Sequence, residues 1–393
     1  MALSTKFGRK RLGSVGTVRR LVVLLSAVVA VDTMFYTALA PLLPHFASTY
    51  GLSKSGAGAL AAMYAVGVLA ASVPGGLAAS RFGPKRAVLV GVALTAAASF
   101  GFGLATDAWT LGAARLAQGI GSAFSWAGAL AWLVAAAPAG RRGTLIGTAM
   151  GAAVFGALLG PALGGVATLA GIRATFLAVS VAGALLCAFL AAAQGSSARP
   201  QSLSALRRAD SRLLAALWLV ILPALLFGVL TVLVPLKLHG FGWGGVAIGG
   251  LFLGTAALET ALNPVLGRLT DVRGRTQPVR VALMASIAVS VALAWAGSAA
   301  FLAVLVVAAG LSYGALYTPG MALVSDSAER NGIAQGLAFG VMNLGWALGA
   351  VIGPAAGGAL AQSAGDVVPY LLLAGICLAT LAYSQSRSRP RSA

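Results

Sequence analysis

The chain has 393 residues, of which 59% are hydrophobic and only 9% are charged, and its mean hydropathy is +0.93. These values lie outside the range of soluble globular proteins and exclude a soluble enzyme or binding module. The formal net charge of +19 is high enough to raise the question of a nucleic-acid partner, which the positions of the cations decide.

Apolar stretches long enough to cross a bilayer recur along the whole chain. A helix needs about 20 such residues to span roughly 30 Å of hydrocarbon. Because lipid cannot form hydrogen bonds with exposed backbone groups, long apolar stretches of this kind must be helices. The first stretch follows a basic segment like that of a secretory signal, but the eleven further stretches argue against a cleaved leader. We predict an all-α integral membrane protein with twelve transmembrane helices, at residues 21–46, 55–79, 87–106, 109–137, 144–169, 173–194, 213–238, 245–267, 279–297, 299–324, 333–362 and 367–384.

The basic residues gather on one side of these predicted helices. With the N-terminus in the cytoplasm, 23 of the 27 Lys and Arg residues lie in cytoplasmic segments. Lys54, Arg173 and Lys237 lie on the opposite, non-cytoplasmic side of the membrane, and Arg115 falls within a span. Because this is the positive-inside distribution, we predict a multi-pass protein of the inner or plasma membrane with both termini in the cytoplasm. The net charge then reflects topology and contact with anionic membrane lipids, not nucleic acid.

The sequence contains an internal duplication. TALAPLLPH at 37–45 recurs as TVLVPLKLH at 231–239, and GALLGPALGG at 156–165 recurs as GAVIGPAAGG at 349–358. GLAASRFGPK, which begins at Gly76, recurs as GRLTDVRGRT, which begins at Gly267. Three ordered matches at nearly one offset predict two parallel six-helix bundles. We expect a basic tail at 1–20, bundles at 21–194 and 213–384, a cytoplasmic linker at 195–212 and a second tail at 385–393.

Two short loops carry residues on which a family resemblance rests. GLAASRFGPKR and GRLTDVRGR resemble the GxLaDRxGRK loop signature of the major facilitator superfamily, and the topology and repeat resemble that family from residue 21 to 384. The resemblance implies that these loops latch the cytoplasmic ends of the halves, with Ser80 standing where the family has an acid. The alternative is that their cations only set topology. The gating residues so implied are Gly76, Ser80, Arg81, Gly83, Lys85, Gly267, Asp271, Arg273, Gly274 and Arg275.

Two helix motifs resemble a branch of that family. RLAQGIG at 115–121 resembles the RxxQGxG signature of proton-linked members, and GALLGPALGG resembles the GxxxGPxxGG signature of antiporters. By spacing alone, the glycines predict a stripe on which another helix packs closely, while the proline permits a bend. The residues of this motif and its repeat are Gly156, Gly160, Pro161, Gly164, Gly165, Gly349, Gly353, Pro354, Gly357 and Gly358.

Asp32 is one of only eight acids, and it lies about midway along the first predicted helix. An ionised carboxylate at the bilayer centre costs at least roughly 2.5 kcal/mol, so Asp32 should face the bundle interior and be paired or protonated. DTMFYTALAPLLP, from residue 32, resembles helix 1 of the twelve-helix drug:proton antiporters and of vesicular monoamine transporters. We expect Asp32 to be a proton or substrate-cation site. The alternative is a structural acid with satisfied partners.

Glu259 and Arg115 are the other charged residues expected deep within the spans, away from their ends. Glu259 lies at a similar depth in the other half, and we expect it to be a second titrating site. Arg115 keeps its proton, so it can modulate Asp32, bind an anionic group or brace helix 1; we favour modulation. Aromatic rings near the cavity suit a hydrophobic cation. The expected cavity residues are Phe35, Tyr36, Tyr64, Gln118, Trp126, Asn263, Tyr313, Tyr317, Asn343 and Trp346.

The sequence lacks a phosphate-cradling GxxxxGK[ST] loop and the spacing of catalytic or zinc motifs. We therefore expect no enzyme activity, catalytic residue, cofactor or metal, and a carrier that works as a monomer on gradient energy. We predict a proton-coupled antiporter that exports small hydrophobic compounds, with a preference for cations, by alternating access. The alternatives are an exporter or uniporter of neutral solutes such as sugars or amino acids, and a non-transporting receptor with the same fold.

Overall fold

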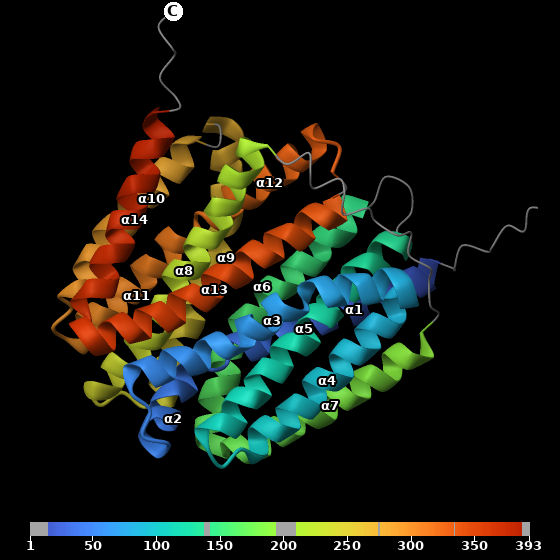
Figure 1. The fold of residues 1–393 in the computed structure, drawn as a ribbon, viewed down its shortest axis with the longest axis horizontal. Coiled ribbons are helices and arrows are strands. Elements are labelled where there is room, and N and C mark those ends of the chain that lie inside the picture. The colour runs from blue at the N-terminus through green and yellow to red at the C-terminus, as the bar shows by residue number, and fades with distance from the viewer. Residues whose placement is uncertain (1–14, 137–141, 194–209, 274–275, 334, 387–393) are drawn as a thin grey trace, which may run out of the picture.

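The computed structural model describes residues 15–136, 142–193, 210–273, 276–333 and 335–386, and these segments are helices joined by short connections (Figure 1). The outer parts of both predicted tails and most of the predicted linker lie outside the described residues. The first half contains α1 (Val15–Thr37), η1 (Ala40–Leu42), α2 (Leu43–Thr49), α3 (Lys54–Phe82), α4 (Pro84–Leu104), α5 (Ala108–Ala136), α6 (Arg142–Ala170) and α7 (Ile172–Ala192). The second half contains α8 (Ser211–Gly240), α9 (Gly245–Arg273), α10 (Thr276–Ala294), α11 (Ala299–Gly314), α12 (Tyr317–Arg330), α13 (Gln335–Ala364) and α14 (Val367–Ser386).

Eleven segments of the described chain are long and apolar enough to cross a membrane. α5 is not among them, although its 29 residues are enough to span a bilayer. Its polar residues Arg115, Gln118 and Ser122 are buried inside the protein. A helix that turns polar groups inward can span without being uniformly apolar. With α5, the described chain has the twelve spans that the sequence predicts.

Two of the predicted spans are broken, which corrects the expectation of continuous helices at 21–46 and 299–324. α1 ends at Thr37 and is followed by η1 and α2, where Pro41 and Pro44 lack backbone N–H donors. In the second case α11 ends at Gly314 and α12 begins at Tyr317, shortly before Pro319. Each of these prolines removes one backbone hydrogen bond to the residue four positions earlier, and its ring crowds the preceding turn, so the helix is interrupted there.

The same helix pairs recur in the two halves. α1 packs on α6 and α8 packs on α13, while α4 packs on α7 and α10 packs on α14. Glycines permit the first two contacts: a Cβ atom at Gly156 would lie 2.0 Å from the Ala30 carbonyl oxygen, and one at Gly349 would lie 2.3 Å from that of Ile221. Neither position can hold a side chain without separating the helices. The predicted glycine stripe therefore holds α6 against α1 and α13 against α8.

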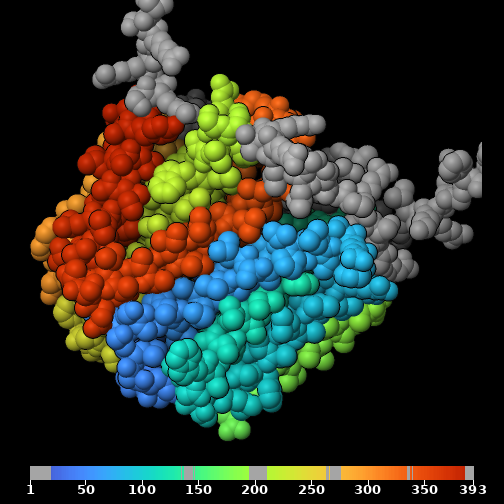
Figure 2. All heavy atoms as spheres, in the orientation of Figure 1, coloured from blue at the N-terminus to red at the C-terminus, as the bar shows by residue number. Residues whose placement is uncertain are grey.

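The last glycine of each stripe contacts the other half. Gly165 of α6 lies against Gly249 of α9, and Gly358 of α13 lies against Gly58 of α3. Figure 2 shows α3 and α13 side by side along one face of the molecule. Each glycine stripe thus makes two contacts, one with a helix of its own half and one with a helix of the other half.

The two ends of the helix bundle differ in charge and in closure. At the end that we call the basic end, α3 meets α4 and α8 begins; Arg81, Arg86 and Arg212 are exposed there. At the opposite end, Lys54 Nζ forms an ion pair with Asp366 Oδ1 across the two halves, at 2.5 Å. We call this the latch end.

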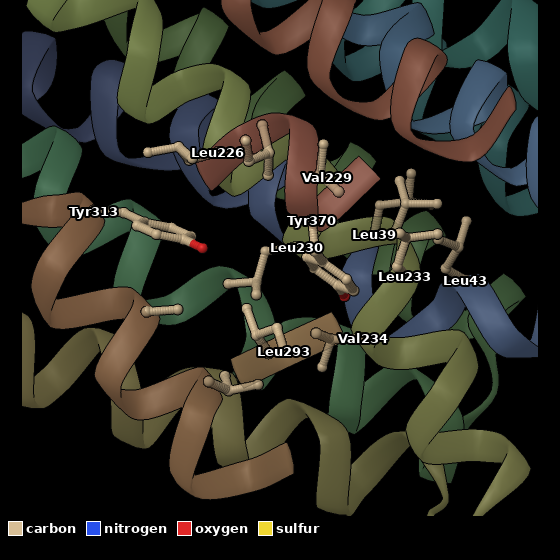
Figure 3. Close-up of a cluster of buried hydrophobic side chains, with 14 of the residues drawn as sticks. Leu39, Leu43, Leu226, Val229, Leu230, Leu233, Val234, Leu293, Tyr313 and Tyr370 are labelled. Atoms are coloured by element: carbon tan, nitrogen blue, oxygen red, sulfur yellow. The ribbon is translucent and has the colours of Figure 1, made fainter. Parts of the chain in front are cut away.

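A buried apolar core closes the latch end around α8. Leu226, Leu230 and Leu233 of α8 pack among Tyr313 of α11, Leu293 of α10, Tyr370 of α14 and Leu39 beside η1 (Figure 3). In lipid, such contacts are stabilised by close packing, because there is little hydrophobic driving force between apolar helices. Since Leu39 comes from the first half, this core joins the halves at the end opposite the basic loops.

Candidate functional site

A cavity of about 1230 Å³ lies between the two halves. Toward the basic end its wall includes Ser80 of α3, Ala135 of α5 and Gly340 of α13, each near the end of its helix that faces the basic loops. In the other direction the wall includes Ala40 of η1 and Pro354 of α13, where the halves touch. The cavity therefore extends toward the basic end and is closed at the latch end.

Asp32 forms part of the cavity wall and is 3% exposed. Its Oδ2 accepts three hydrogen bonds: from Ser122 Oγ at 2.5 Å, from Trp126 Nε1 at 2.7 Å and from Tyr64 OH at 3.0 Å. Its Oδ1 is buried and has no hydrogen-bond partner in the described chain. One carboxylate oxygen is thus saturated with donors, and the other is left for a proton or a ligand. The predicted coupling role of Asp32 stays a prediction.

Arg115 braces α1 and makes no ion pair with Asp32. Its Nη1 donates to the Phe35 carbonyl oxygen at 2.9 Å and to Gln118 Oε1 at 3.2 Å, and its Nη2 donates to the Tyr36 carbonyl oxygen at 3.3 Å. These carbonyls lie near the end of α1, where the last carbonyl groups lack intrahelical partners. The contacts match the bracing alternative rather than direct modulation of Asp32.

Two groups of aromatic rings line the cavity. Tyr36 of α1 contacts Tyr64 of α3 and, edge-on at 4.9 Å between ring centroids, Trp346 of α13. Tyr317 of α12 stacks on Phe227 of α8, with centroids 6.3 Å apart and planes at 9°. The first group crosses from one half to the other, so ring faces and edges surround the space beside Asp32.

Most predicted cavity residues that the structure describes line the cavity, but three do not. Tyr36, Tyr64, Trp126, Tyr317, Asn343 and Trp346 belong to its wall, and the side chain of Asn263 lies outside the described residues. Phe35 is wrong as a cavity residue because it packs against Phe176, about 100° around α1 from Tyr36. Gln118 is turned toward Ser99, and Tyr313 shares a hydrogen bond with Ser290, so both lie behind the wall.

Glu259 of α9 lines the same cavity from the second half. No described side chain donates a hydrogen bond to its carboxylate or forms an ion pair with it. The carboxylate lies directly against Gly314 at the end of α11: a Cβ atom there would be 2.5 Å from Glu259 Cδ. The structure thus brings the two predicted acids to one cavity, one from each half.

The first copy of the predicted gating loop makes contacts within its own half. Ser80, in place of the acid, donates to the Leu77 carbonyl oxygen of its own helix at 2.9 Å. Gly83 has φ +94°, a conformation that favours glycine, and it permits the tight connection between α3 and α4. Arg81 lies over the Phe82 ring. No described contact of these residues crosses to the second half.

Lys85 of the same loop caps a helix. Its Nζ donates to the carbonyl oxygens of Ala191 and Ala193 at the end of α7, both at 2.6 Å. Cations at helix C-termini satisfy free carbonyls. Arg280 of α10 makes the corresponding contact with the Ser384 carbonyl oxygen at the end of α14. In the second loop copy, the surroundings of Gly267, the side chains of Asp271 and Arg273, and all of Gly274 and Arg275 lie outside the described residues.

Two residues of the site escaped the sequence analysis. Ser122 lies four residues from both Gln118 and Trp126 on α5, so helical spacing alone could have placed it beside them. Phe227 belongs to a continuous apolar run of α8, and no sequence signal separates it from the core residues around it.

Comparison with known proteins supports the fold and the family. The sequence profile of the Major Facilitator Superfamily matches residues 24–338 and 229–392. The chain is 29% identical over 136 residues to the synaptic vesicular amine transporter of Mus musculus, and 31% identical over 147 residues to the vesicular acetylcholine transporter of Drosophila melanogaster. Each match covers 34% of this chain, and the matched parts are 26% and 23% of those proteins. The chain thus matches about a quarter of the length of these relatives.

Two solved transporters share the fold along nearly the whole chain. A bacterial homologue of the human lysosomal transporter Spinster, inward-facing and occupied, aligns with a TM-score of 0.77 and 15% identity over 96% of this chain and 98% of that one. A D-xylose–proton symporter aligns with a TM-score of 0.72 and 15% identity over 94% of this chain and 97% of that one. At these identities the likeness concerns the fold alone. The predicted fold class and family resemblance are confirmed, and the chain belongs to the Major Facilitator Superfamily, whose members are generally carriers rather than enzymes.

Proposed function

We propose that this protein is a proton-coupled antiporter that exports small hydrophobic organic cations across the cytoplasmic membrane. The observation that carries this proposal is Asp32: a buried carboxylate in the wall of a large cavity, with one oxygen that has no partner. A buried charge must be paired or neutralised. A proton and a cationic cargo are the two species that can do this in turn.

The chemistry of the wall favours a hydrophobic cation. Asp32 and Glu259 supply negative charge, and Tyr36, Trp346 and Tyr317 supply aromatic surface. Arg115 belongs to the wall, but its guanidinium is engaged by main-chain carbonyls and Gln118. Aromatic faces and carboxylates attract organic cations and give little to anions. The vesicular relatives are amine and acetylcholine transporters, which is consistent with such cargo.

In the proposed cycle, the conformation that is open at the basic end is the state that loads cargo. The positive-inside rule assigns the basic end to the cytoplasm. A cavity open at that end loads cytoplasmic cargo, and closure there with opening of the latch end releases it outside. In this scheme the halves 21–194 and 213–384 rock against each other about the cavity. Protonation of Asp32, Glu259 or both then competes with cargo and returns the empty carrier.

The test uses the full chain in proteoliposomes with an acidic lumen. The probe is radiolabelled N-methyl-4-phenylpyridinium, whose permanent charge prevents its own titration from mimicking coupling. The expected result is accumulation that collapses when the pH gradient is abolished, and at least tenfold less accumulation with Asp32→Asn and Glu259→Gln together. Glu329→Gln, an exposed acid of α12, is the matched control and should transport normally.

Two outcomes contradict the proposal. Uptake of a neutral sugar or amino acid that is insensitive to the pH gradient, with no uptake of the cation, identifies a uniporter instead. Binding of the cation without any flux identifies a receptor with a transporter fold.

A further inference from the structure

The two carboxylates of the cavity have different surroundings. Asp32 receives three donors from α3 and α5, all of them on Oδ2. Hydrogen bonds of this kind stabilise the ionised form of a carboxylate and hold its plane in place. Oδ1 is buried and has no partner in the described chain, so a cation that reaches it after a small shift of the surrounding side chains meets a fixed and unshared negative charge.

Glu259 has none of this support. No described donor or cation reaches its carboxylate, which is pressed against the backbone of Gly314. The described titratable group that faces it is Tyr317 of α12, which carries no positive charge. Those that face Asp32 are Tyr64 of α3 and, behind that ring, Arg115 of α5. A carboxyl group with an apolar wall and no donor is most stable when it is neutral.

From this asymmetry we infer that the two acids have separate roles. Asp32 stays ionised through the cycle and binds the positive centre of the cargo at Oδ1, while Glu259 alone carries the exchanged proton. Gly314 is a positioning residue, because its missing side chain makes room for the Glu259 carboxyl group. This inference rests on the proposed function and refines it.

The charge balance of this scheme fixes the stoichiometry. When a monovalent cation enters the cavity, its field favours ionisation of Glu259, which releases one proton to the solvent. The loaded site then holds two carboxylates and one cation, with a net charge of −1. The returning site holds ionised Asp32 and protonated Glu259, also with a net charge of −1. One proton is exchanged for one cation, and no net charge crosses the membrane.

A binding experiment on detergent-solubilised full-length protein separates the two roles. N-methyl-4-phenylpyridinium is added in weak buffer, and proton release and binding are both measured. Wild type should release one proton per cation bound. Glu259→Gln should release less than a tenth as much and bind the cation roughly tenfold more weakly, with an affinity that no longer depends on pH, whereas Asp32→Asn should lose at least tenfold in affinity and still release one proton per cation bound. Undiminished release from Glu259→Gln overturns the inference but leaves proton-coupled transport intact.

Gly314→Ala tests the same point with the acid retained. An added methyl group would lie 2.2 Å from Glu259 Oε1 and must displace the carboxyl group. We expect proton release per bound cation to fall at least threefold. Gly254→Ala, on α9 with open space around it, is the control and should match wild type. Equal proton release from Gly314→Ala and wild type would remove Gly314 from the scheme and contradict the positioning argument.

A flux experiment needs no variant. In proteoliposomes with a fixed pH gradient, a potassium diffusion potential of 100 mV set with valinomycin should change the final accumulation ratio of the cation less than twofold. Exchange of two protons would make transport electrogenic and change that ratio by roughly fifty-fold. A change of that size overturns the single-proton scheme. Absence of any gradient-driven uptake overturns the proposed function itself.

Discussion

Asp32 of α1 and Leu226 of α8 occupy corresponding positions of the internal repeat, since Thr37 corresponds to Thr231 in the same match. Asp32 lines the cavity, whereas Leu226 is buried in the apolar core of Figure 3. The second acid also has an aliphatic counterpart, Val68, which lines the cavity as well. Glu259 of α9 corresponds to Val68 of α3, 191 residues earlier. Each half therefore contributes one acid to the cavity wall, at a position where the other half has an aliphatic side chain.

This difference shows which features the duplication preserves. The helix pairs and their glycine contacts recur in both halves, because they depend on close backbone packing that any copy of the fold requires. The polar network of Asp32, Tyr64, Ser122 and Trp126 has no counterpart among the described residues of the second half. The glycine contacts between helices are thus alike in the two halves, whereas the polar residues around the cavity acids differ. Variants can test the helix contacts and the polar residues separately.

The largest expected effect is a loss of thermal stability when the glycine contacts between helices are disrupted, and it should be similar in the two halves. Gly156→Ala and Gly349→Ala each place a methyl group about 2 Å from a backbone carbonyl of the partner helix. Overpacking of this kind costs about 1–3 kcal/mol or more, so both variants should lower the thermal unfolding midpoint by a similar amount. Differential scanning fluorimetry of the purified protein measures it.

The matched control for this pair is Gly151→Ala on α6, where nothing lies within 4 Å of the added atom. This change should leave the midpoint unchanged or raise it, because alanine stabilises a helix by about 0.5–1 kcal/mol relative to glycine. A large loss in only one half would contradict the symmetry of the scaffold.

The next effect is asymmetric and concerns the donors to Asp32. Trp126→Phe and Tyr64→Phe each remove one hydrogen bond to the carboxylate while keeping an aromatic ring. Hydrogen bonds to charged groups contribute about 1.5–3 kcal/mol, so without one of them Asp32 takes up a proton more readily, and that proton competes with the cation; cation affinity at pH 7 should fall roughly tenfold. Tyr317→Phe, in the second half, should change affinity less than about threefold. Equilibrium binding of the labelled cation measures all three, and equal losses would remove the proposed distinction between the acids.

The sequence predicts the depth of a residue in the membrane much better than its direction around the helix. Twelve spans, the repeat and the glycine stripe follow from composition and spacing, and the structure agrees with them. Phe35 and Tyr36 are neighbours in the sequence, yet only Tyr36 lines the cavity, because one residue turns the side chain by about 100°.

The direction of the Arg115 side chain could not be predicted from the sequence either. Its depth near Asp32 suggested an interaction between the two charges, but its guanidinium reaches the carbonyls of Phe35 and Tyr36, about one turn further along α1. Those carbonyls are free because α1 breaks before Pro41. The prolines were visible in the sequence, but the partner of the broken helix end depends on the packing of α5.

A smaller effect concerns the ion pair that joins the halves at the latch end. Lys54 and Asp366 have side chains 39% and 28% exposed, so the pair is worth about 0.2–1 kcal/mol. Lys54→Gln or Asp366→Asn should favour opening of the latch end and lower the apparent cation affinity from the basic side by up to about fivefold. The charge swap Lys54→Asp with Asp366→Lys should restore it. A swap that binds as poorly as the single variants would show that the pair does not hold the halves together.

The smallest effect compares the caps at the basic end, where the first half uses the cation Lys85 and the second half uses the acid Asp210. Asp210 is the N-cap of α8: it accepts hydrogen bonds from the Leu213 backbone N–H at 2.9 Å and from Ser327 Oγ of α12 at 3.1 Å. The backbone hydrogen bond from Leu213 lowers the pKa of Asp210 below its ordinary value of 3.8.

Because that pKa is lower in the folded protein, the cap contributes its full stability above pH 3.8 and loses it as the pH falls through the folded value. Asp210→Ala should lower the unfolding midpoint slightly at pH 7, and the difference from wild type should shrink as the solution is acidified toward pH 3. Asp210→Asn, which keeps an acceptor at the cap, should retain most of the midpoint at pH 7. Lys85→Met removes a cation that stays protonated across this range, so its deficit should not vanish on acidification. If the loss of stability in Asp210→Ala were independent of pH, the charge of the carboxylate would not contribute to the cap of α8.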